Sequence, residues 1–434
     1  MKAEAAPRTV KLDYLTRVEG EGGLYARVEQ GEVRELRLTI FEPPRFFEAF
    51  LRGRHLQEVP DITARICGIC PVAYQMSSVH ALEAALGIDP GPEVRRLRRL
   101  LYCAEWIESH ALHIYLLQAP DFLGYESGVS LAGEHPREVE RGLRLKKIGN
   151  ALLEVLGGRA IHPVSVCVGG FYKAPRRRDL LALRDELQWA VEAARETVRW
   201  VAGFPFPEFA PAYEFVSLRH PDEYPMNEGR IVSTAGVDIA PAEFEKVFLE
   251  EHVAHSTALH SVRAGERTSY CVGPLARLNL NFEKLTPQAQ EALRETGLAA
   301  PWRNPFTGVV ARAVELLQAC EEALAIIEAY EEPARSRMEF TPRAAEGCAV
   351  TEAPRGLLYH RYRVNEQGLV EFAKIVPPTS QNLRRMEDDL RLWLPRLLER
   401  PEPEMALACE GLIRCYDPCI SCSTHFLKLR LQRD

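Results

Sequence analysis

The sequence has no long apolar run. No segment reaches the roughly 18 uncharged apolar residues that spanning a bilayer requires, and the stretch from Met1 to Leu12 lacks the apolar centre of a secretory signal. A basic surface is also missing, because the formal net charge is -7 and the lysines and arginines are interspersed with glutamates. These absences argue against a membrane and against nucleic acid as partners. We expect a cytoplasmic protein.

No repeat, low-complexity tract or Ser/Gly-rich linker divides the 434 residues. No G-x-G-x-x-G follows a predicted strand, so the chain shows no dinucleotide site of its own. Apolar residues, by contrast, are plentiful: 46% of the chain is hydrophobic, which is enough to bury a large core. A single large domain is the simplest organisation.

Hydrophobic periodicity predicts a mainly α protein with small β-sheets, an α+β fold. Apolar residues alternate from Val10 to Phe41 around Gly22-Gly23 and Gln30-Gly31, which predicts a short antiparallel meander. A second alternating stretch, GLLYHRYRVNEQGLVEFAKIV, predicts a hairpin with its turn at Asn365–Gly368. Helical spacing predicts helices at residues 74–86, 93–118, 143–156, 178–201, 287–295, 309–330 and 380–397.

Four of the eleven cysteines form two C-x-x-C pairs. Cys67 and Cys70 stand in RICGICP at the start of a predicted helix, and Cys419 and Cys422 stand in DPCISCSTH near the end. An odd total with two such pairs is typical of a reducing compartment, where thiols bind metals instead of forming disulfides. The pairs are 349 positions apart from Cys70 to Cys419, so a site that uses both needs the fold of the whole chain.

Spacing alone leaves two kinds of site equally open: a structural zinc tetrahedron and a redox metal with a vacant position. Zinc modules usually hold their two pairs within a few tens of residues, because the metal replaces a core that such modules lack. This chain has ample core. Arg65, Asp417 and His425 flank the pairs, and such side chains serve an open redox centre better than a closed structural one.

The motifs around the cysteines resemble those of [NiFe] hydrogenase large subunits. RICGICP and DPCISCSTH match the two signature motifs of that family, and the other matching motifs stand in the family's order. They are TRVEGEG (16–22), GGRAIHPVSVCVGGF (157–171), VGPLARLN (272–279) and EAPRG (352–356). The resemblance covers essentially the whole chain and implies the family's large-subunit fold, a single helical domain over residues 1–425.

The resemblance implies a nickel ion held by all four thiolates. Cys67 and Cys419 would be terminal nickel ligands, while Cys70 and Cys422 would bridge to an iron that carries carbon monoxide and two cyanides. Soft thiolates suit both metals, and a vacant bridging position leaves room for the substrate. The implied reaction is the reversible heterolytic splitting of H2 into protons and electrons.

Other positions match family residues that surround the metals. Arg355 in EAPRG would lie above the vacant position, orient H2 and hydrogen-bond one cyanide, with Asp417 as its carboxylate partner. Glu19 in TRVEGEG would stand beside a bridging cysteine and start the proton relay. Thr379 or Ser380, in IVPPTSQN, would hydrogen-bond the second cyanide, and an extra proline leaves that register open.

Glu48 and His425 resemble the ligands of a remote magnesium or iron ion, joined by a backbone carbonyl near Ile375. Hard oxygen ligands favour magnesium, and the single imidazole keeps iron open. In the family, a dedicated protease removes the residues after this histidine once nickel is inserted. We therefore expect the extension 426–434 to be cleaved; the alternative is an ordinary terminal strand.

Two positions depart from the family. Many members have histidine four residues after the second cysteine of the first pair, where this chain has Tyr74, which keeps a donor but loses a base. Many also carry aspartate where Ser109 precedes His110, so Arg355 would have one carboxylate partner instead of two. CGICPVAYQ resembles the cytoplasmic bidirectional branch that exchanges electrons with NADP or NAD and includes sulfur-reducing members.

The seven remaining cysteines are scattered and are expected to be free and buried, so the chain holds no iron–sulfur cluster of its own. Electrons would leave through a small subunit with iron–sulfur clusters, and flavin/NAD(P)-reductase and ferredoxin-like subunits would complete a heterotetramer. The proton would pass to Cys419 or Arg355 and then to Glu19. A deazaflavin-linked hydrogenase and a hydrogen sensor share the site and remain alternatives. A quinone-reducing respiratory subunit shares the fold but normally lacks these cysteines.

Overall fold

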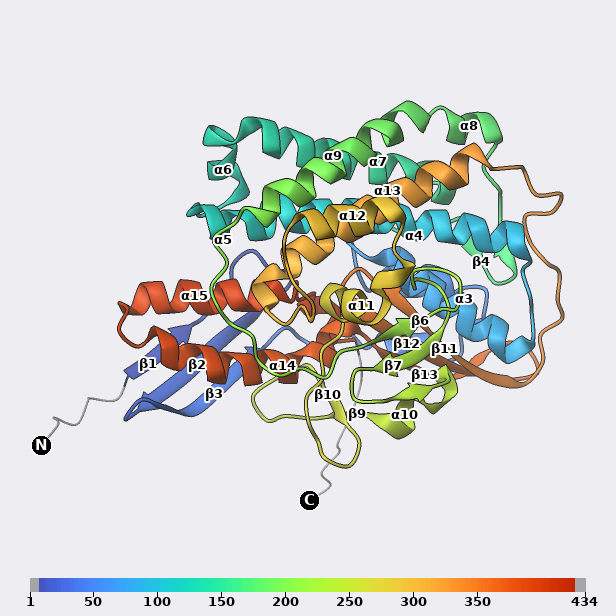
Figure 1. The fold of residues 1–434 in the computed structure, drawn as a ribbon. Helices are drawn as coiled ribbons and strands as arrows, with labels where there is room; N and C mark the ends of the chain where they lie inside the picture. Colours follow the sequence, from blue (N-terminus) through green and yellow to red (C-terminus); the bar gives the residue numbers. More distant parts are fainter. Residues whose placement is uncertain (1–7, 426–434) are drawn as a thin grey trace, which may run out of the picture.

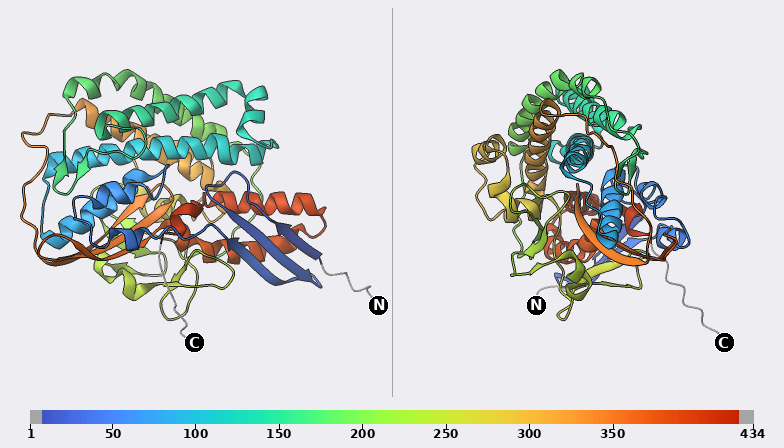
Figure 2. Two further views of the ribbon diagram at one scale, coloured as in Figure 1. Left: turned by 180° about the vertical axis from the view of Figure 1, so that it is seen from behind. Right: turned by 90° about the vertical axis from the view of Figure 1, so that its right-hand side faces the viewer.

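The computed structural model describes residues 8–425, which form two layers. Long helices stack along one side, and small antiparallel sheets gather along the other (Figure 1). From behind, the helices again lie above the sheets (Figure 2). This arrangement confirms the predicted mainly α fold with small sheets. The domain boundary at residue 425 stays a prediction, and the extension 426–434 lies outside the described residues.

The N-terminal sheet is the predicted meander. β1 (Arg8–Leu12), β2 (Gly22–Glu29) and β3 (Glu32–Ile40) pair antiparallel in the order β1-β2-β3. Gln30 and Gly31 join β2 to β3, and both have positive φ, as a two-residue hairpin turn requires. The glycine pair that the pattern assigned to the first turn begins β2 instead, so the connection from β1 is a longer loop. That loop enters the site described below.

Four long helices make up most of the helical layer: α4 (Pro92–Leu112), α7 (Pro136–Gly157), α9 (Arg184–Ala202) and α13 (Gly308–Glu328). α4 packs against α7 and α13, and α13 packs against α9. α9 is amphipathic, and its buried stripe consists of Leu187, Ala190, Val191, Ala194, Val198 and Val201. α4 and α13 are buried on nearly every side, so their polar residues must find partners inside the protein.

The predicted C-terminal hairpin is present. β12 (Gly356–Val364) pairs antiparallel with β13 (Val370–Val376), and the turn lies at the predicted residues. Gly368 has φ 75°, and the Asn365 side chain accepts hydrogen bonds from the backbone N–H groups of Gln367 and Leu369. The Asn and Gly of this turn therefore act as the sequence pattern indicates.

A third strand, β11 (Ala345–Ala353), pairs with the other edge of β12 and was not expected from the sequence. Ala353 pairs with Gly356, so the two residues between them, one of which is Arg355, form a tight turn. α3 (Pro71–Leu86), which begins directly after Cys70, packs against β11 and β12. The sheet thereby positions an arginine at the tip of a short, well-supported hairpin.

Shorter elements complete the described chain. The helices are α1 (Phe47–Leu51), α2 (Val59–Ala64), α5 (Ala119–Leu123), α6 (Gly128–Glu134), α8 (Arg177–Leu181), α10 (Phe244–Val247), α11 (Pro274–Asn281), α12 (Pro287–Glu295), α14 (Pro378–Trp393), α15 (Glu402–Cys415) and α16 (Ile420–Ser423). The strands are β4 (Val166–Cys167), β5 (Gly170–Phe171), β6 (Val216–Arg219), β7 (Arg230–Ser233), β8 (Asp238–Ile239), β9 (Phe248–Glu251) and β10 (His260–Arg263).

The predicted helix bounds agree with the observed ones to different degrees. α12 has the predicted bounds, α7 begins seven residues before its prediction, and the predicted helix at 93–118 is α4 followed by a π-helical segment, His113–Gln118. The predicted helix at 178–201 is interrupted and forms α8 and α9. Within residues 8–425, no helix combines the length and the apolar character that crossing a membrane demands.

Candidate metal centre

The first cysteine pair lies in the loop between α2 and α3. Cys70 is the residue before α3, and Pro71 is its first residue, a position where the missing N–H costs nothing. The backbone N–H groups of Ile69 and Cys70 point at Cys67 Sγ, at 3.3 and 3.2 Å. Donors of this kind stabilise a thiolate, so the loop itself prepares Cys67 to bind a metal.

The second pair lies at the start of the short helix α16: Cys419 is the residue before the helix, and Cys422 lies within it. The N-terminal loop runs beside it: Glu19 and Cys419 form a parallel β-bridge, in which the Ile420 N–H donates to Glu19 O at 2.8 Å. Gly20 makes this contact possible, because it has φ 89° and a Cβ there would lie 2.7 Å from Ile420 Cβ. The TRVEGEG motif therefore needs glycine where it touches the C-terminal cysteine loop.

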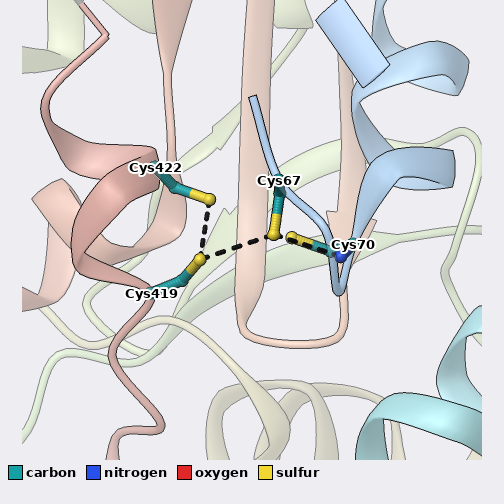
Figure 3. Close-up of side chains that lie close together, drawn as sticks. All are labelled: Cys67, Cys70, Cys419 and Cys422. Carbon is teal, nitrogen blue, oxygen red and sulfur yellow. Dashed lines mark hydrogen bonds between the residues drawn. The ribbon is translucent and has the colours of Figure 1, made fainter. Parts of the chain in front are cut away.

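The four cysteines converge on one point (Figure 3). Their Sγ atoms all lie within 4.8 Å of one another, with 3.5 Å between those of Cys67 and Cys419 and 2.8 Å between those of Cys419 and Cys422. Each cysteine is at most 4% exposed. The set therefore has the size and the dryness of a metal site made only of sulfur ligands.

Electrostatics favours a cation at the centre of the four sulfurs. Hydrogen bonds from Cys419, Cys422 and Cys70 lower the pKa of Cys67 well below its usual value. The same sulfur contacts raise the pKa of Cys419 well above its usual value, since a second thiolate so close is repelled. All four can ionise together only when metal ions neutralise them, so metal binding and deprotonation are linked.

Arg355 reaches the same site from the turn between β11 and β12. Its Nε donates to Asp417 O at 2.8 Å and its Nη2 to Asp417 Oδ1 at 3.1 Å. Burial alone lowers the pKa of Arg355, but the charges of Asp417 and Cys419 raise it well above its usual value. Arg355 Nη1 and Asp417 Oδ2 are buried and have no hydrogen-bond partner among residues 8–425. A buried guanidinium with one free nitrogen has room for a further acceptor.

Arg277 supports that turn, and sequence reasoning assigned it no role. Its guanidinium binds both oxygens of Glu315 at 2.7 Å, Glu352 Oε2 at 2.9 Å, and the carbonyls of Ala353 and Pro354 at 3.0 and 2.8 Å. The group is fully buried. Arg277 and Glu352 belong to the VGPLARLN and EAPRG motifs, so the sequence did mark both residues. The motifs did not show that the two side chains form an ion pair.

Glu19 contacts the metal site directly. Cys419 Sγ lies 3.0 Å from Glu19 Oε2, which also accepts the Ser421 N–H at 3.1 Å. Glu19 was expected beside a bridging cysteine, whereas its neighbour is Cys419, which was expected to be a terminal ligand. The parallel bridge between the two backbones explains this choice of neighbour, because it puts residue 19 level with residue 419.

Thr379 and Ser380 occupy the first turn of α14. Thr379 Oγ1 accepts the Cys419 N–H at 3.0 Å, so its hydroxyl hydrogen stays free to donate. Ser380 Oγ is buried and has no hydrogen-bond partner among residues 8–425. Both prolines of the ambiguous segment lie at the start of the helix, with Pro377 before it and Pro378 as its first residue. Of these two residues, Thr379 is therefore the one whose hydroxyl oxygen forms a hydrogen bond with the second cysteine loop.

Two further side chains tie the cysteine loops together and were missed from the sequence. Arg45 Nη2 donates to Ile66 O at 2.6 Å and also to Ser421 O, which links the residue before Cys67 to the residue before Cys422. Glu105 on α4 accepts the N–H groups of Val72 and Ala73 at 2.6 and 3.1 Å and so holds the start of α3. Neither residue lies in a signature motif.

The two departures from the family pattern are both buried, and Tyr74 lies near the cysteines. Tyr74 is 1% exposed, and its hydroxyl has no hydrogen-bond partner among residues 8–425. Burial and the nearby charges of Cys422 and Cys70 raise its pKa well above the usual value. Ser109 Oγ likewise has no partner in the described chain. Asp417 is the one carboxylate shown within ion-pair distance of Arg355 among residues 8–425, in agreement with the expectation.

Glu48, Ile375 and His425 come together as the sequence predicts. His425 Nδ1 lies 2.5 Å from Cys422 O, while its Nε2 lies 2.6 Å from Ile375 O and 3.8 Å from Glu48 Oε1. A neutral imidazole has one N–H, so it cannot donate to both carbonyls, and burial lowers the pKa of His425 and disfavours the doubly protonated form. Either neutral tautomer therefore leaves one ring nitrogen lone pair facing a carbonyl oxygen. The Glu48 carboxylate, the Ile375 carbonyl and the His425 imidazole are ligand types that suit a cation.

The other cysteines do not gather into a second cluster among residues 8–425. All eleven are free, and each of the remaining seven is buried except Cys348, which is half-buried. Burial raises the pKa of each of these thiols above its usual value. They are Cys103, Cys167, Cys271, Cys320, Cys348, Cys409 and Cys415.

Comparison with known proteins identifies this arrangement. A family model described as nickel-dependent hydrogenase matches residues 45–138 and 265–425, which include the four cysteines, Arg355 and His425. The chain therefore belongs to the nickel-dependent hydrogenase family, and it is the catalytic large subunit of a [NiFe] hydrogenase, an oxidoreductase. The four-cysteine site fits the nickel–iron centre of that family.

Among individual proteins, the chain is similar to two subunits from Pyrococcus furiosus. It is 37% identical to sulfhydrogenase 2 subunit alpha over 423 residues, covering 97% of this chain and 100% of that one. It is 34% identical to sulfhydrogenase 1 subunit alpha over 432 residues, covering 97% and 98%. A solved structure of an NAD+-reducing [NiFe]-hydrogenase in the H2-reduced state matches with a TM-score of 0.83 at 27% identity, covering 96% of this chain and 99% of that one.

Proposed function

We propose that this subunit splits and forms H2 reversibly and heterolytically, and that the electrons pass to NADP or NAD through partner subunits. The observation that carries this proposal is the grouping of four sulfur ligands with a carboxylate at 3.0 Å from one sulfur and a buried guanidinium beside them. The first gives the metals their ligands, the second accepts a proton, and the third supplies a fixed positive charge.

In this proposal the metal ligands divide into two kinds. Cys67 and Cys419 would bind nickel alone, and Cys70 and Cys422 would hold both nickel and an iron that carries carbon monoxide and two cyanides. When bound, such a centre would supply the polarisation of H2 and the acceptance of its electrons, a chemistry that the protein's own side chains lack. The backbone N–H groups that face Cys67 Sγ support its role as a thiolate.

Cys419 and Glu19 form the first two steps of the proton exit. The sulfur of Cys419 takes the proton, with Arg355 as the other candidate, and Glu19 Oε2 receives it over 3.0 Å. The Ser421 N–H at 3.1 Å holds that oxygen in place. Glu19 is only partly buried, so its carboxylate has a side open for passing the proton on towards solvent.

Arg355 orients the substrate, and Asp417 orients Arg355. Two of the guanidinium nitrogens are held by the aspartate, which aims the third, Nη1, at an acceptor beyond the described side chains. A cyanide on iron fits that position, because a planar guanidinium with one free nitrogen matches an anionic acceptor. The hydroxyl of Thr379, or that of Ser380, donates to the second cyanide.

Glu48, His425 and the Ile375 carbonyl hold a magnesium ion. Two oxygens and one imidazole nitrogen fit magnesium with bound waters, and iron is the alternative ion. Because His425 Nδ1 contacts Cys422 O, an ion there restrains the second cysteine loop. The proteolytic removal of 426–434 after His425 belongs to the same proposal.

The acceptor and the partners follow from what this chain lacks. No second cysteine cluster is found among residues 8–425, so electrons leave through a small iron–sulfur subunit. A flavin/NAD(P)-reductase subunit and a ferredoxin-like subunit complete a cytoplasmic heterotetramer. The similar solved structure named as NAD+-reducing supports this choice of acceptor over a deazaflavin.

Infrared spectroscopy of the purified complex tests the metal centre, and turnover assays test the acceptor. We expect bands from iron-bound carbon monoxide and cyanide, and H2-dependent reduction of NADP or NAD. The absence of those bands together with zinc as the sole metal would overturn the proposal. Reduction of a deazaflavin alone would move the chain to that alternative, and intact bands with negligible turnover would make it a hydrogen sensor.

A further inference from the structure

A second group of possible metal ligands lies away from the cysteines, at His255, His260 and Glu387. One ligand atom from each residue lies within 4.8 Å of the other two. His260 begins β10, Glu387 lies on α14, and His255 lies in the loop between β9 and β10. Figure 1 shows β10 below α14, and α14 packs against both β10 and β3. Three separate segments therefore meet at this point.

The hydrogen bonding of this group is incomplete. His260 is fully buried, yet neither of its ring nitrogens has a hydrogen-bond partner among residues 8–425. A buried polar side chain without partners is destabilising relative to one whose hydrogen bonds are satisfied. The ring meets that of His255 edge-on, with 5.8 Å between ring centroids. One ring nitrogen of His260, which has no hydrogen-bond partner among residues 8–425, lies within 4.8 Å of a ligand atom of His255 and of Glu387.

Two contacts hold the Glu387 carboxylate in place. Glu387 Oε1 accepts the Leu38 N–H of β3 at 3.0 Å and lies 2.7 Å from His255 Nε2. The Glu387 side chain is 3% exposed, whereas that of His255 is 21% exposed, so solvent reaches the group from one side. Burial lowers the pKa of His260 to about 3, which keeps the ring neutral and its nitrogen lone pair available.

We propose that His255, His260 and Glu387 form a second cation site that binds zinc or a similar divalent transition ion. Two imidazoles and one carboxylate are a known ligand set for zinc, with a fourth position open to water. Ligands at about 2.1 Å from a tetrahedral ion are about 3.4 Å apart, within the spacing seen here. Arg384 is the nearby positive charge, and Asp388, 3.7 Å away, pairs with it.

An ion at this site joins the β9–β10 loop, β10 and α14. The first turn of α14 carries Thr379, which accepts the Cys419 N–H. The site therefore restrains the helix that braces the nickel–iron centre, without contributing a ligand to it. This restraint on α14 does not depend on which electron acceptor the enzyme uses.

Zinc retention by the nickel-loaded complex tests the proposal. The complex is treated with EDTA, equilibrated with zinc chloride and desalted, and zinc, nickel and iron are measured together per chain. We expect one zinc per chain in the wild type, loss of that zinc in H260A and E387Q, and retention in H220A, a histidine variant outside the group. Zinc should also raise the melting temperature of the wild type and leave that of E387Q unchanged.

The variants distinguish loss of the site from loss of the fold. H255Q changes the partly exposed ligand and leaves the core intact, and it should weaken zinc binding at least tenfold while nickel and iron stay at wild-type levels. Cobalt in place of zinc should give the visible absorption of an imidazole-bound ion in the wild type alone. Equal zinc retention by the wild type and E387Q, or loss of the zinc in E48Q instead, would overturn the proposal.

Discussion

Replacing Glu19 by glutamine removes one proton-carrying group and little else. The amide oxygen of the new side chain can keep the contact with the Ser421 N–H, now 3.1 Å from Glu19 Oε2, and the backbone bridge to Cys419 is unaffected. What is lost is a group that accepts a proton across 3.0 Å from Cys419 Sγ and passes it on. Positioned acids and bases contribute about 10²- to 10⁴-fold to a rate. We expect H2 uptake to fall by about that factor, because proton transfer away from Cys419 then limits turnover in place of the chemistry at the metals.

The assay separates proton transfer from metal chemistry. H2-dependent dye reduction should collapse in E19Q, while nickel and iron content and the interconversion of para- and ortho-hydrogen persist, because both precede the exit of the proton. E21Q is the matched control, since Glu21 is the exposed glutamate of the same motif. Wild-type uptake in E19Q, or an equal loss in E21Q, contradicts the role of Glu19.

Three other predictions use the same complex. R355K keeps the charge but loses the two-nitrogen contact with Asp417, so kcat should fall roughly 100- to 1000-fold with the metals retained; a smaller loss measured by H2 uptake counts against orientation by the guanidinium. Y74F removes a buried hydroxyl without a partner in the described chain, so the melting temperature and the carbon monoxide band should both stay as in the wild type; a shifted band would contradict this and mean that the hydroxyl donates to a sulfur in the loaded centre. Burial raises the pKa of Glu48 to about 7, so in metal-free enzyme the folded state holds that proton more tightly than the unfolded state, and the stability present below pH about 4.5 is lost as the pH rises towards 7. Magnesium, or the substitution E48Q, should flatten that decline in a melting-temperature series.

The sequence could predict which residues serve the centre but not how they meet. The two cysteine pairs and Arg355 stand in recognisable motifs. Cys67 and Cys70 lie before the N-terminus of α3, Cys419 and Cys422 lie at the start of the short helix α16, and Arg355 lies in a two-residue turn. The contact between Glu19 and Cys419 spans 400 positions and depends on a backbone bridge that no local pattern encodes. This is why the sequence predicts Glu19 at the site but does not say which cysteine it contacts.

Secondary structure was missed where local signals are weak. α15 carries two cysteines and Gly411 among its apolar positions, and these residues lower the helix propensity on which the prediction rests. The break between α8 and α9 lies at Ala182 and Leu183, with no glycine or proline to mark it. The residues of β11 are of mixed polarity, so their pattern does not predict a strand. The strand is recognised in the structure by its pairing with β12.

The buried charge of Arg277 has a role that its sequence motif alone does not reveal. Arg277 looks like an ordinary helix residue in VGPLARLN, yet it is fully buried and bound to Glu315 on α13 and Glu352 on β11. A buried pair is costly to form and costlier to break, so its value lies in fixing geometry more than in stability. The carbonyls of Ala353 and Pro354, which Arg277 also binds, directly precede Arg355. The structure thus uses one buried arginine to hold the backbone from which the other reaches the metals, which is why a change at Arg277 should disturb the centre without touching any of its ligands.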